Sequence, residues 1–293
     1  MPAPSKLTGV EALAANESRM LALFLAAAVA SPAPQATPLP SPTRILGLIR
    51  AKFRSHRPPP PYVVYTLERK QLTDQGFPDY SESYKEHIWL RSADRAALSR
   101  RIFRSINRGE LTFERPAFNE DRDPGPPTAD LFEPAPLRPH PVSDVPTPEA
   151  VQSALPVIGV VTALGEFDYR VVTMDPEGDE LHLVIAPTRD PDRNRLRELW
   201  VERTTLELRK VVATDKLFIL GTKDVYGVTF TISLDMLDGR PVVTAIHGVV
   251  GDGYTGDGST VDYTFTNISF PDTLPDWYFD GKQYVAHQAE APL

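Results

Sequence analysis

The sequence predicts an α+β fold that is mainly antiparallel β-sheet, with about eleven strands and two helices. Hydrophobic and polar residues alternate in segments 225–235 and 261–269, which is typical of strands with one buried face and one solvated face. The links between predicted strands are short and contain turn residues such as Asp238-Gly239, as hairpins require. Such a sheet must cover its apolar face with helices, with a second sheet or with an apolar ligand. Each of these three coverings predicts a different function.

Segment 1–30 has the layout of a signal peptide. The apolar run from Leu21 to Ala30 follows Lys6 and Arg19, and Ala28-Val29-Ala30 supplies the small residues of a cleavage site. Because the run is too short to span a bilayer, we expect an exported protein, periplasmic or secreted. A disordered Ala-rich tail with a chance apolar patch is the alternative, and Met20 is an alternative start.

A proline-rich linker and an amphipathic helix come next. Segment 31–42 carries five prolines, which is typical of a linker. In segment 43–56 the apolar residues fall at helical spacing and basic residues take the other side, which predicts a helix that begins at Pro42 or Thr43. Its apolar residues are Ile45, Leu48, Ile49 and Phe53.

The rest of the chain forms one predicted domain, 43–282, followed by a tail, 283–293. Its predicted strands are 62–71, 84–91, 98–106, 111–113, 167–175, 180–186, 195–203, 206–214, 225–235, 242–250 and 261–269. Segment 116–147 is acidic, has few aromatic residues and is rich in proline, so we expect a disordered insert. A second helix is predicted to start at Thr147-Pro148-Glu149 and to run to about Leu164. Its apolar residues include Leu155, Ile158 and Val161.

Composition excludes several classes of function. The formal net charge of −8 argues against nucleic acid as a partner, because an acidic chain gains nothing from counterion release. The chain has no cysteine, which removes thiol catalysis, thiolate metal sites and disulfides. The nucleophile elbow, the phosphate-binding loop and the HExxH motif are absent from the sequence. We therefore predict no enzyme, no catalytic residue, no metal ligand and no cofactor.

Large aromatic and aliphatic residues within the strands are candidates for the lining of a hydrophobic cavity. A sheet larger than two short helices can cover leaves room for such a cavity, although an ordinary packed core is the alternative for each single residue. A one-residue slip in register would move several of these side chains to the other face. The predicted lining residues are Tyr65, Leu67, Trp89, Trp200, Phe230, Ile232 and Phe265.

The segment from Leu181 to Val211 resembles the outer-membrane lipoprotein-sorting family, the LolA type. In that family a strand that ends in proline precedes a strand with the pattern Leu-Trp-Val and a following Thr, and then a returning strand. The matching residues here are Pro187, Leu199, Trp200, Val201, Thr205 and Leu208, while Glu202-Arg203 replaces the family's Asp-Pro turn. The resemblance covers residues 43–115 and 148–282. It implies a curled half-barrel whose concave side is plugged by helices, with acyl chains bound between sheet and helices.

We therefore expect an exported, non-catalytic carrier of acyl chains from a lipid or lipoprotein. The helices at 43–56 and 148–164 would act as plug and lid. We expect a monomer, whose other partners would be membrane-associated release or acceptor proteins. The first alternative is a periplasmic sensor or interaction module on the same fold with no bound ligand, in which segment 116–147 would be the contact segment. A hydrolase with an unrecognised site is the second alternative.

Overall fold

The computed structural model describes residues 40–56, 58–73, 80–106, 109–110, 116–118, 124–135, 168–218, 225–251 and 259–290. The predicted signal peptide, the helix 148–164 and the strand 111–113 lie outside these residues. The helices are α1 (Pro42–Arg54), η2 (Asp276–Phe279), α3 (Gly281–Ala286) and η3 (Gln288–Glu290). The strands are β1 (Tyr62–Thr73), β2 (Tyr80–Arg91), β3 (Ala97–Ile106), β4 (Gly109–Glu110), β5 (Pro116–Phe118), β6 (Tyr169–Glu177), β7 (Glu180–Pro187), β8 (Leu196–Glu202), β9 (Leu208–Phe218), β10 (Val225–Leu237), β11 (Arg240–Val250) and β12 (Thr260–Ser269).

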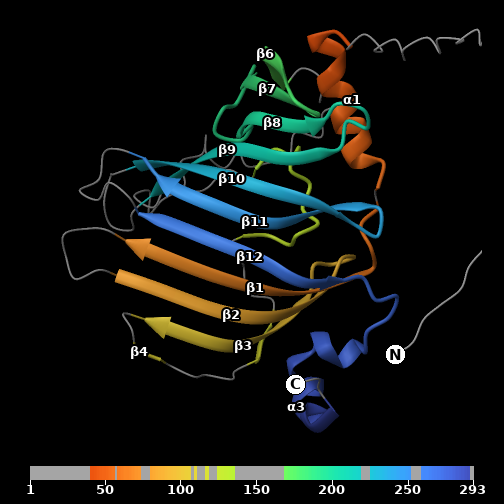
Figure 1. The fold of residues 1–293 in the computed structure, drawn as a ribbon. Coiled ribbons are helices and arrows are strands. Elements are labelled where there is room, and N and C mark those ends of the chain that lie inside the picture. Colours follow the sequence, from red (N-terminus) through yellow and green to blue (C-terminus); the bar gives the residue numbers. More distant parts are fainter. Residues whose placement is uncertain are drawn as a thin grey trace, which may run out of the picture. The chain divides into compact units, whose positions relative to one another are not determined.

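All of these strands belong to one 12-stranded sheet, in the order β4-β3-β2-β1-β12-β11-β10-β9-β8-β7-β6, with β5 paired to β3 off this path. Neighbouring strands pair antiparallel, and most are consecutive in the chain. Along this path the exception is β1, which pairs with β12 and so joins the two halves of the chain; off the path, β5 pairs with β3. The order begins at β4 and ends at β6, so the sheet is open (Figure 1). The predicted fold class, an antiparallel sheet that does not close into a barrel and has few helices, is confirmed.

Local sequence explains the hairpins well. The turn between β10 and β11 falls at Asp238 and Gly239, as predicted, and both residues have positive φ, 49° and 73°. Two consecutive left-handed residues give the turn a twist that matches the strands on either side. The predicted strands 62–71, 98–106, 180–186 and 225–235 match β1, β3, β7 and β10 to within a few residues.

Directly opposed residues in an antiparallel sheet share a face, so the register divides the side chains into two sets. One row that crosses the sheet contains Leu183, Leu199, Val211, Ile232, Ile246, Tyr263 and Arg69. We call its side the inner face, because its residues up to Tyr263 belong to or pack against the main hydrophobic core. The adjacent row on the outer face contains His182, Trp200, Lys210, Ser233, Ala245, Thr264 and Glu68.

Helix α1 packs on the inner face. Pro42 occupies its first turn, where a missing N–H costs nothing, and Lys52 and Arg54 lie in its last turn. Ile45, Ile49 and Phe53 are buried, as predicted for the apolar side. The prediction for Leu48 is wrong in detail: it is half-buried, and Leu46 takes the buried position.

Residues 124–135 also lie against the inner face, behind the sheet in the view of Figure 1. Phe132 is only 3% exposed and packs edge-on against Phe53, with ring centroids 5.5 Å apart. The backbone is held as well, since Val243 donates its N–H to the carbonyl of Pro127. The prediction of disorder throughout 116–147 is therefore wrong for β5 and for 124–135. One aromatic anchor and backbone hydrogen bonds hold a segment that is otherwise rich in proline.

A second, smaller core covers the outer face of β1, β2 and β3. It joins Trp89 and Leu98 to Tyr278, Phe279 and Tyr284 of the carboxyl-terminal helices. The sequence predicted that the domain ends at 282. That boundary is wrong, because α3 continues to Ala286 and Tyr284 is only 2% exposed. No helix among the described residues combines the length and the apolar character needed to cross a membrane.

Candidate functional site

The inner face carries a continuous apolar surface, and it is the candidate ligand-binding region. Of the predicted lining residues, Tyr65, Leu67, Phe230, Ile232 and Phe265 all belong to this face. Leu67 lies directly opposite Phe265 across β1 and β12, and the rings of Tyr65 and Phe265 have centroids 5.8 Å apart. On β10, Ile232 is opposed by Val211 and Ile246. The structure thus brings these five predicted residues onto one surface.

Gly248 makes room for the largest side chain of β10 on this face. It lies opposite Phe230, and a Cβ atom at Gly248 would come within 2.7 Å of the Phe230 ring and 2.8 Å of Val261 Cγ1. Any larger residue at 248 would therefore force the Phe230 ring to move. The glycine sets the position of this ring on the inner face.

Trp89 is not part of this surface. It lies opposite Val64 and Leu98 on the outer face, where it makes an edge-on contact with Tyr278 at 6.0 Å between centroids. Its predicted place in the lining is wrong, because β2 is apolar on both faces at this point. Ile88 faces the main core while Trp89 faces the carboxyl-terminal helices.

Trp200 also lies on the outer face, so its prediction as a lining residue is wrong too. Its neighbours in the register are His182 and Lys210. Leu199 and Val201, on either side of it in the chain, face the main core. The sequence could not assign Trp200 to a face of the sheet. Strand β8 is buried on both faces, and register shifts interrupt its pairing with β9, so the usual alternation is hidden.

Toward β2 and β3 the inner face becomes charged, a feature that the sequence analysis missed. The guanidinium groups of Arg69 and Arg101 lie 5.6 Å and 5.1 Å from the centre of the Tyr84 ring. Arg101 Nε donates to the buried carboxylate of Glu86 at 2.6 Å. Burial raises the pKa of Tyr84 to about 12, against the opposing effect of Arg69. The inner face therefore changes from aliphatic to aromatic and cationic along its width.

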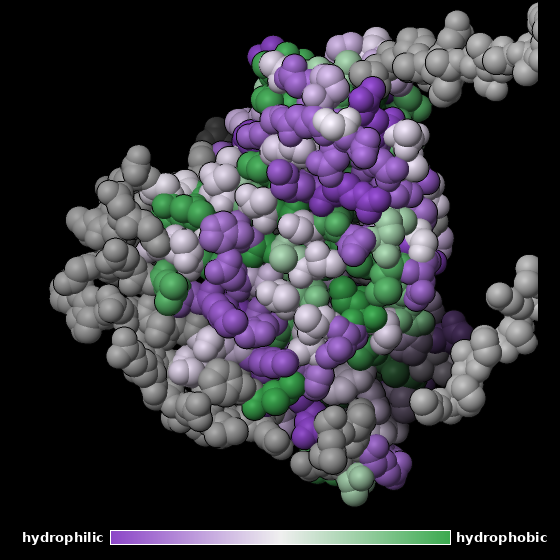
Figure 2. Space-filling model, in the orientation of Figure 1, coloured by the Kyte–Doolittle hydropathy of each residue, from purple (hydrophilic) through white to green (hydrophobic). Residues whose placement is uncertain are grey.

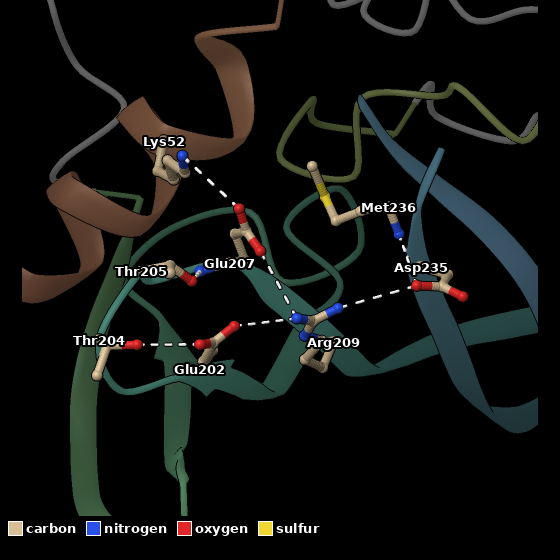
Figure 3. Close-up of polar contacts among 8 residues, drawn as sticks. All are labelled: Lys52, Glu202, Thr204, Thr205, Glu207, Arg209, Asp235 and Met236. Atoms are coloured by element: carbon tan, nitrogen blue, oxygen red, sulfur yellow. Dashed lines mark hydrogen bonds and ion pairs between the residues drawn. The ribbon is translucent and has the colours of Figure 1, made fainter. Parts of the chain in front are cut away.

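A chain of charged side chains connects α1 to the turn between β8 and β9 (Figure 3). Lys52 Nζ on the helix lies 3.8 Å from Glu207, and Glu207 lies 3.6 Å from Arg209. Arg209 also contacts Glu202 at 3.0 Å, which lowers the pKa of that carboxyl, and Asp235 at 3.9 Å. These side chains keep 21–73% of their surface exposed, so solvent screens each contact.

Among the cavities that border segment 124–135, two are large enough for a small ligand group. The larger, about 410 Å³, lies between this segment and the β2–β3 turn and is lined in part by Leu90, Arg95 and Asp130. The smaller, about 170 Å³, is lined in part by Asp168 and Arg189. Figure 2 shows the outer face of the sheet, which is largely hydrophilic with scattered hydrophobic residues.

No family model and no curated protein matches this chain. Solved structures with similar arrangements include a LolA superfamily protein from Nitrosomonas europaea, with 12% identity, a TM-score of 0.36 and coverage of 80% of this chain and 97% of that one. A DUF1329 family protein from Desulfovibrio piger has 12% identity, a TM-score of 0.38 and coverage of 82% and 98%. An outer-membrane lipoprotein-sorting protein domain from Vibrio parahaemolyticus has 11% identity, a TM-score of 0.35 and coverage of 82% and 96%.

Proposed function

We propose that this chain is an exported, non-catalytic binding protein for the acyl chains of a lipid or lipoprotein. The observation that carries the proposal is the apolar inner face of an open sheet, from Leu183 on β7 to Phe265 on β12. Each methylene that leaves water contributes about 0.8 kcal/mol, so one long acyl chain supplies ample driving force without any catalytic group. Export rests on the apolar run from Leu21 to Ala30.

In this proposal α1 is a movable cover. Ile45, Ile49 and Phe53 occupy apolar space that an acyl chain could take instead. The polar contacts that hold the helix lie at the surface, namely Lys52 with Glu207 at 3.8 Å and Arg54 with Asp130 at 2.9 Å. Exposed ion pairs contribute about 0–1 kcal/mol each, so they orient the helix without locking it. The lid residues predicted on the second helix, namely Leu155, Ile158 and Val161, lie outside the described residues. Their role as a lid remains a prediction.

Lipid extraction tests the proposal directly. The full chain is purified without detergent and extracted with organic solvent, and the extract is analysed by mass spectrometry for bound acyl species. The delipidated protein is then titrated with a fluorescent fatty acid. We expect acyl species in the extract and saturable uptake by the delipidated protein. An empty extract together with no uptake contradicts the proposal.

A matched pair of variants on β10 assigns any uptake to the inner face. Phe230 is half-buried on that face, and Thr229, its neighbour in the chain, is exposed on the other. Phe230→Glu should abolish uptake, because a carboxylate would be placed against the acyl chain. Thr229→Glu should leave uptake unchanged. Circular dichroism of both variants shows whether the fold is retained.

The alternative is a sensor or interaction module on the same fold. One observation favours it: residues of the chain itself, Phe132 and the apolar side of α1, already occupy part of the inner face. In that case segment 116–147 would be the contact segment for a protein partner. Absence of acyl species and of uptake, with a folded chain, would support this alternative.

A further inference from the structure

Arg50 on α1 is a buried cation whose side-chain donors are not all used. Its side chain packs beneath segment 124–135, with the guanidinium carbon 5.5 Å from the centre of the Phe132 ring. The residue is only 7% exposed. Within the part of the chain that the structure describes, neither Nε nor Nη2 has a hydrogen-bond acceptor. Most buried polar groups are hydrogen-bonded, so this arginine requires an explanation.

The carboxylates that act on Arg50 are committed to other groups. Asp130 accepts from Arg54 Nε at 2.9 Å and from the backbone N–H of Phe132 at 3.1 Å. Asp168 accepts from Arg189 Nε at 2.6 Å. Both carboxylates influence Arg50 only through the electrostatic field, and Arg54 opposes them. Among the described residues, the two carboxylates that act on Arg50 are therefore each paired with another arginine, which leaves the charge of Arg50 in excess there.

Burial makes this arrangement costly. Loss of solvent lowers the pKa of Arg50, and the neighbouring charge of Arg54 lowers it further. An ordered water molecule could accept from Nε or Nη2, but a neutral water would not balance the charge. An oxyanion would accept these hydrogen bonds and also balance the charge, because the guanidinium fork matches the two oxygens of a carboxylate or phosphate group.

We propose that Arg50 receives a carboxylate or phosphate oxyanion at the inner face of the sheet, beside Phe132 and α1. That this oxyanion is the head group of an acyl ligand rests on the proposed function. The aromatic residues of the same core, Phe53, Phe132 and Tyr169, would then meet the first methylenes of the chain. The ligand class is an anionic amphiphile such as a fatty acid or a phospholipid.

Two cavities lie beside the carboxylates that act on Arg50, although Arg50 itself lines neither of them. Asp168 lines the cavity of about 170 Å³, and Asp130 lines the cavity of about 410 Å³. The smaller cavity is also lined by Arg189, Arg193 and Asp190, so two arginines and two aspartates face it. Both cavities open beside segment 124–135, whose Phe132 covers the Arg50 guanidinium.

The test compares ligands with the same chain and different heads. The delipidated full chain is titrated calorimetrically with dodecanoate and with dodecanol, and thermal unfolding is followed separately with and without inorganic phosphate. Arg50→Met removes the charge and keeps the shape, and Arg50→Lys keeps the charge and loses the fork. Arg44→Met is the matched control, because Arg44 is an exposed arginine on the same helix.

We expect the unaltered chain to bind dodecanoate about tenfold or more tightly than dodecanol. Arg50→Met should remove this preference and leave dodecanol binding unchanged, Arg50→Lys should reduce it, and Arg44→Met should have no effect. Equal binding of the two ligands by the unaltered chain overturns the proposal, and that result does not depend on whether any variant folds. A preference that survives in Arg50→Met also overturns it.

The phosphate measurement separates this inference from the proposed function. If neither amphiphile binds but phosphate raises the unfolding temperature of the unaltered chain and not of Arg50→Met, acyl binding fails and the oxyanion site stands, with free phosphate as its source. If neither amphiphile binds and phosphate has no effect, both proposals fail.

Discussion

The imidazole of His182 lies parallel to the indole of Trp200 on the outer face of the sheet, with ring centroids 4.1 Å apart and planes 7° apart. Lys210 Nζ lies 3.6 Å from the centre of the indole ring, and Trp200 Nε1 donates to Glu177 at 3.2 Å. Glu198 Oε2 accepts a hydrogen bond from His182 Nε2 at 2.7 Å, which fixes the imidazole. These contacts make Trp200 a structural element of the outer face.

Trp200→Ala should therefore lower stability without affecting ligand uptake. The variant loses the stacked ring, the cation–π contact and the hydrogen bond to Glu177, and we expect the free energy of unfolding to fall by about 3 kcal/mol. Urea unfolding measures this loss, and fluorescent fatty-acid uptake by the folded variant should match that of the unaltered chain. Loss of uptake with unchanged stability would instead show that Trp200 lines the ligand-binding surface.

Gly248→Ala should disturb the inner face through Phe230. The added methyl group would lie within 2.9 Å of two ring atoms, so we expect a destabilisation of about 1–3 kcal/mol and weaker uptake. Gly227→Ala is the control, because no atom lies within 4 Å of a Cβ atom at 227. The cost of Gly248→Ala should shrink when Phe230 is also replaced by alanine, and urea unfolding of the double variant checks this. Equal effects of the two glycine substitutions would contradict the prediction.

Tyr84 should make stability depend on pH in the alkaline range. Its pKa is about 12 in the folded chain, whereas an unfolded tyrosine has a pKa of about 10. The unfolded chain therefore loses this proton first as the pH rises. The contribution of Tyr84 is fully present below pH 10 and declines between pH 10 and pH 12.

The free energy of unfolding should fall by less than about 1.4 kcal/mol per pH unit through Tyr84, because this side chain is only partly buried. Urea unfolding of the unaltered chain and of Tyr84→Phe at pH 9 and at pH 11.5 measures it, since other tyrosines cancel in the difference. Tyr84→Phe should lose less stability between the two pH values. An identical loss in the two proteins would show that the phenol titrates normally.

The positions of many strands along the chain were predictable because their signals are local. Asp238-Gly239 marks a two-residue turn by its own chemistry, and the alternation from Val228 to Leu234 fixes both the strand and its inner face. Phe230 and Ile232 were therefore assigned correctly to the inner face. Helix α1 was predicted for the same reason, from Ile45, Ile49 and Phe53 at helical spacing.

The assignments that failed depend on long-range contacts. Trp89 and Trp200 lie in strand segments that are buried on both faces, so the period of two vanishes and the side of each residue is undetermined from sequence. Phe132 is one aromatic residue in a proline-rich stretch, and its anchoring role depends on Phe53, far away in the chain. The excess charge at Arg50 becomes visible only when the partners of Asp130 and Asp168 are known.

Movement of α1 can be followed directly, because the chain has no cysteine and two introduced cysteines are unique labelling sites. Ala51 is exposed on the helix, and Thr205 is exposed in the β8–β9 turn, which Lys52 approaches through Glu207. Spin labels at Ala51→Cys and Thr205→Cys should report a longer and broader distance distribution when dodecanoate is added, because the acyl chain takes the place of Ile49 and Phe53. A pair at Thr205→Cys and Thr264→Cys, both exposed, should keep its distance, since it lies wholly on the sheet. If calorimetry shows binding while the helix–sheet distance stays fixed, α1 is a permanent part of the core and another element admits the ligand.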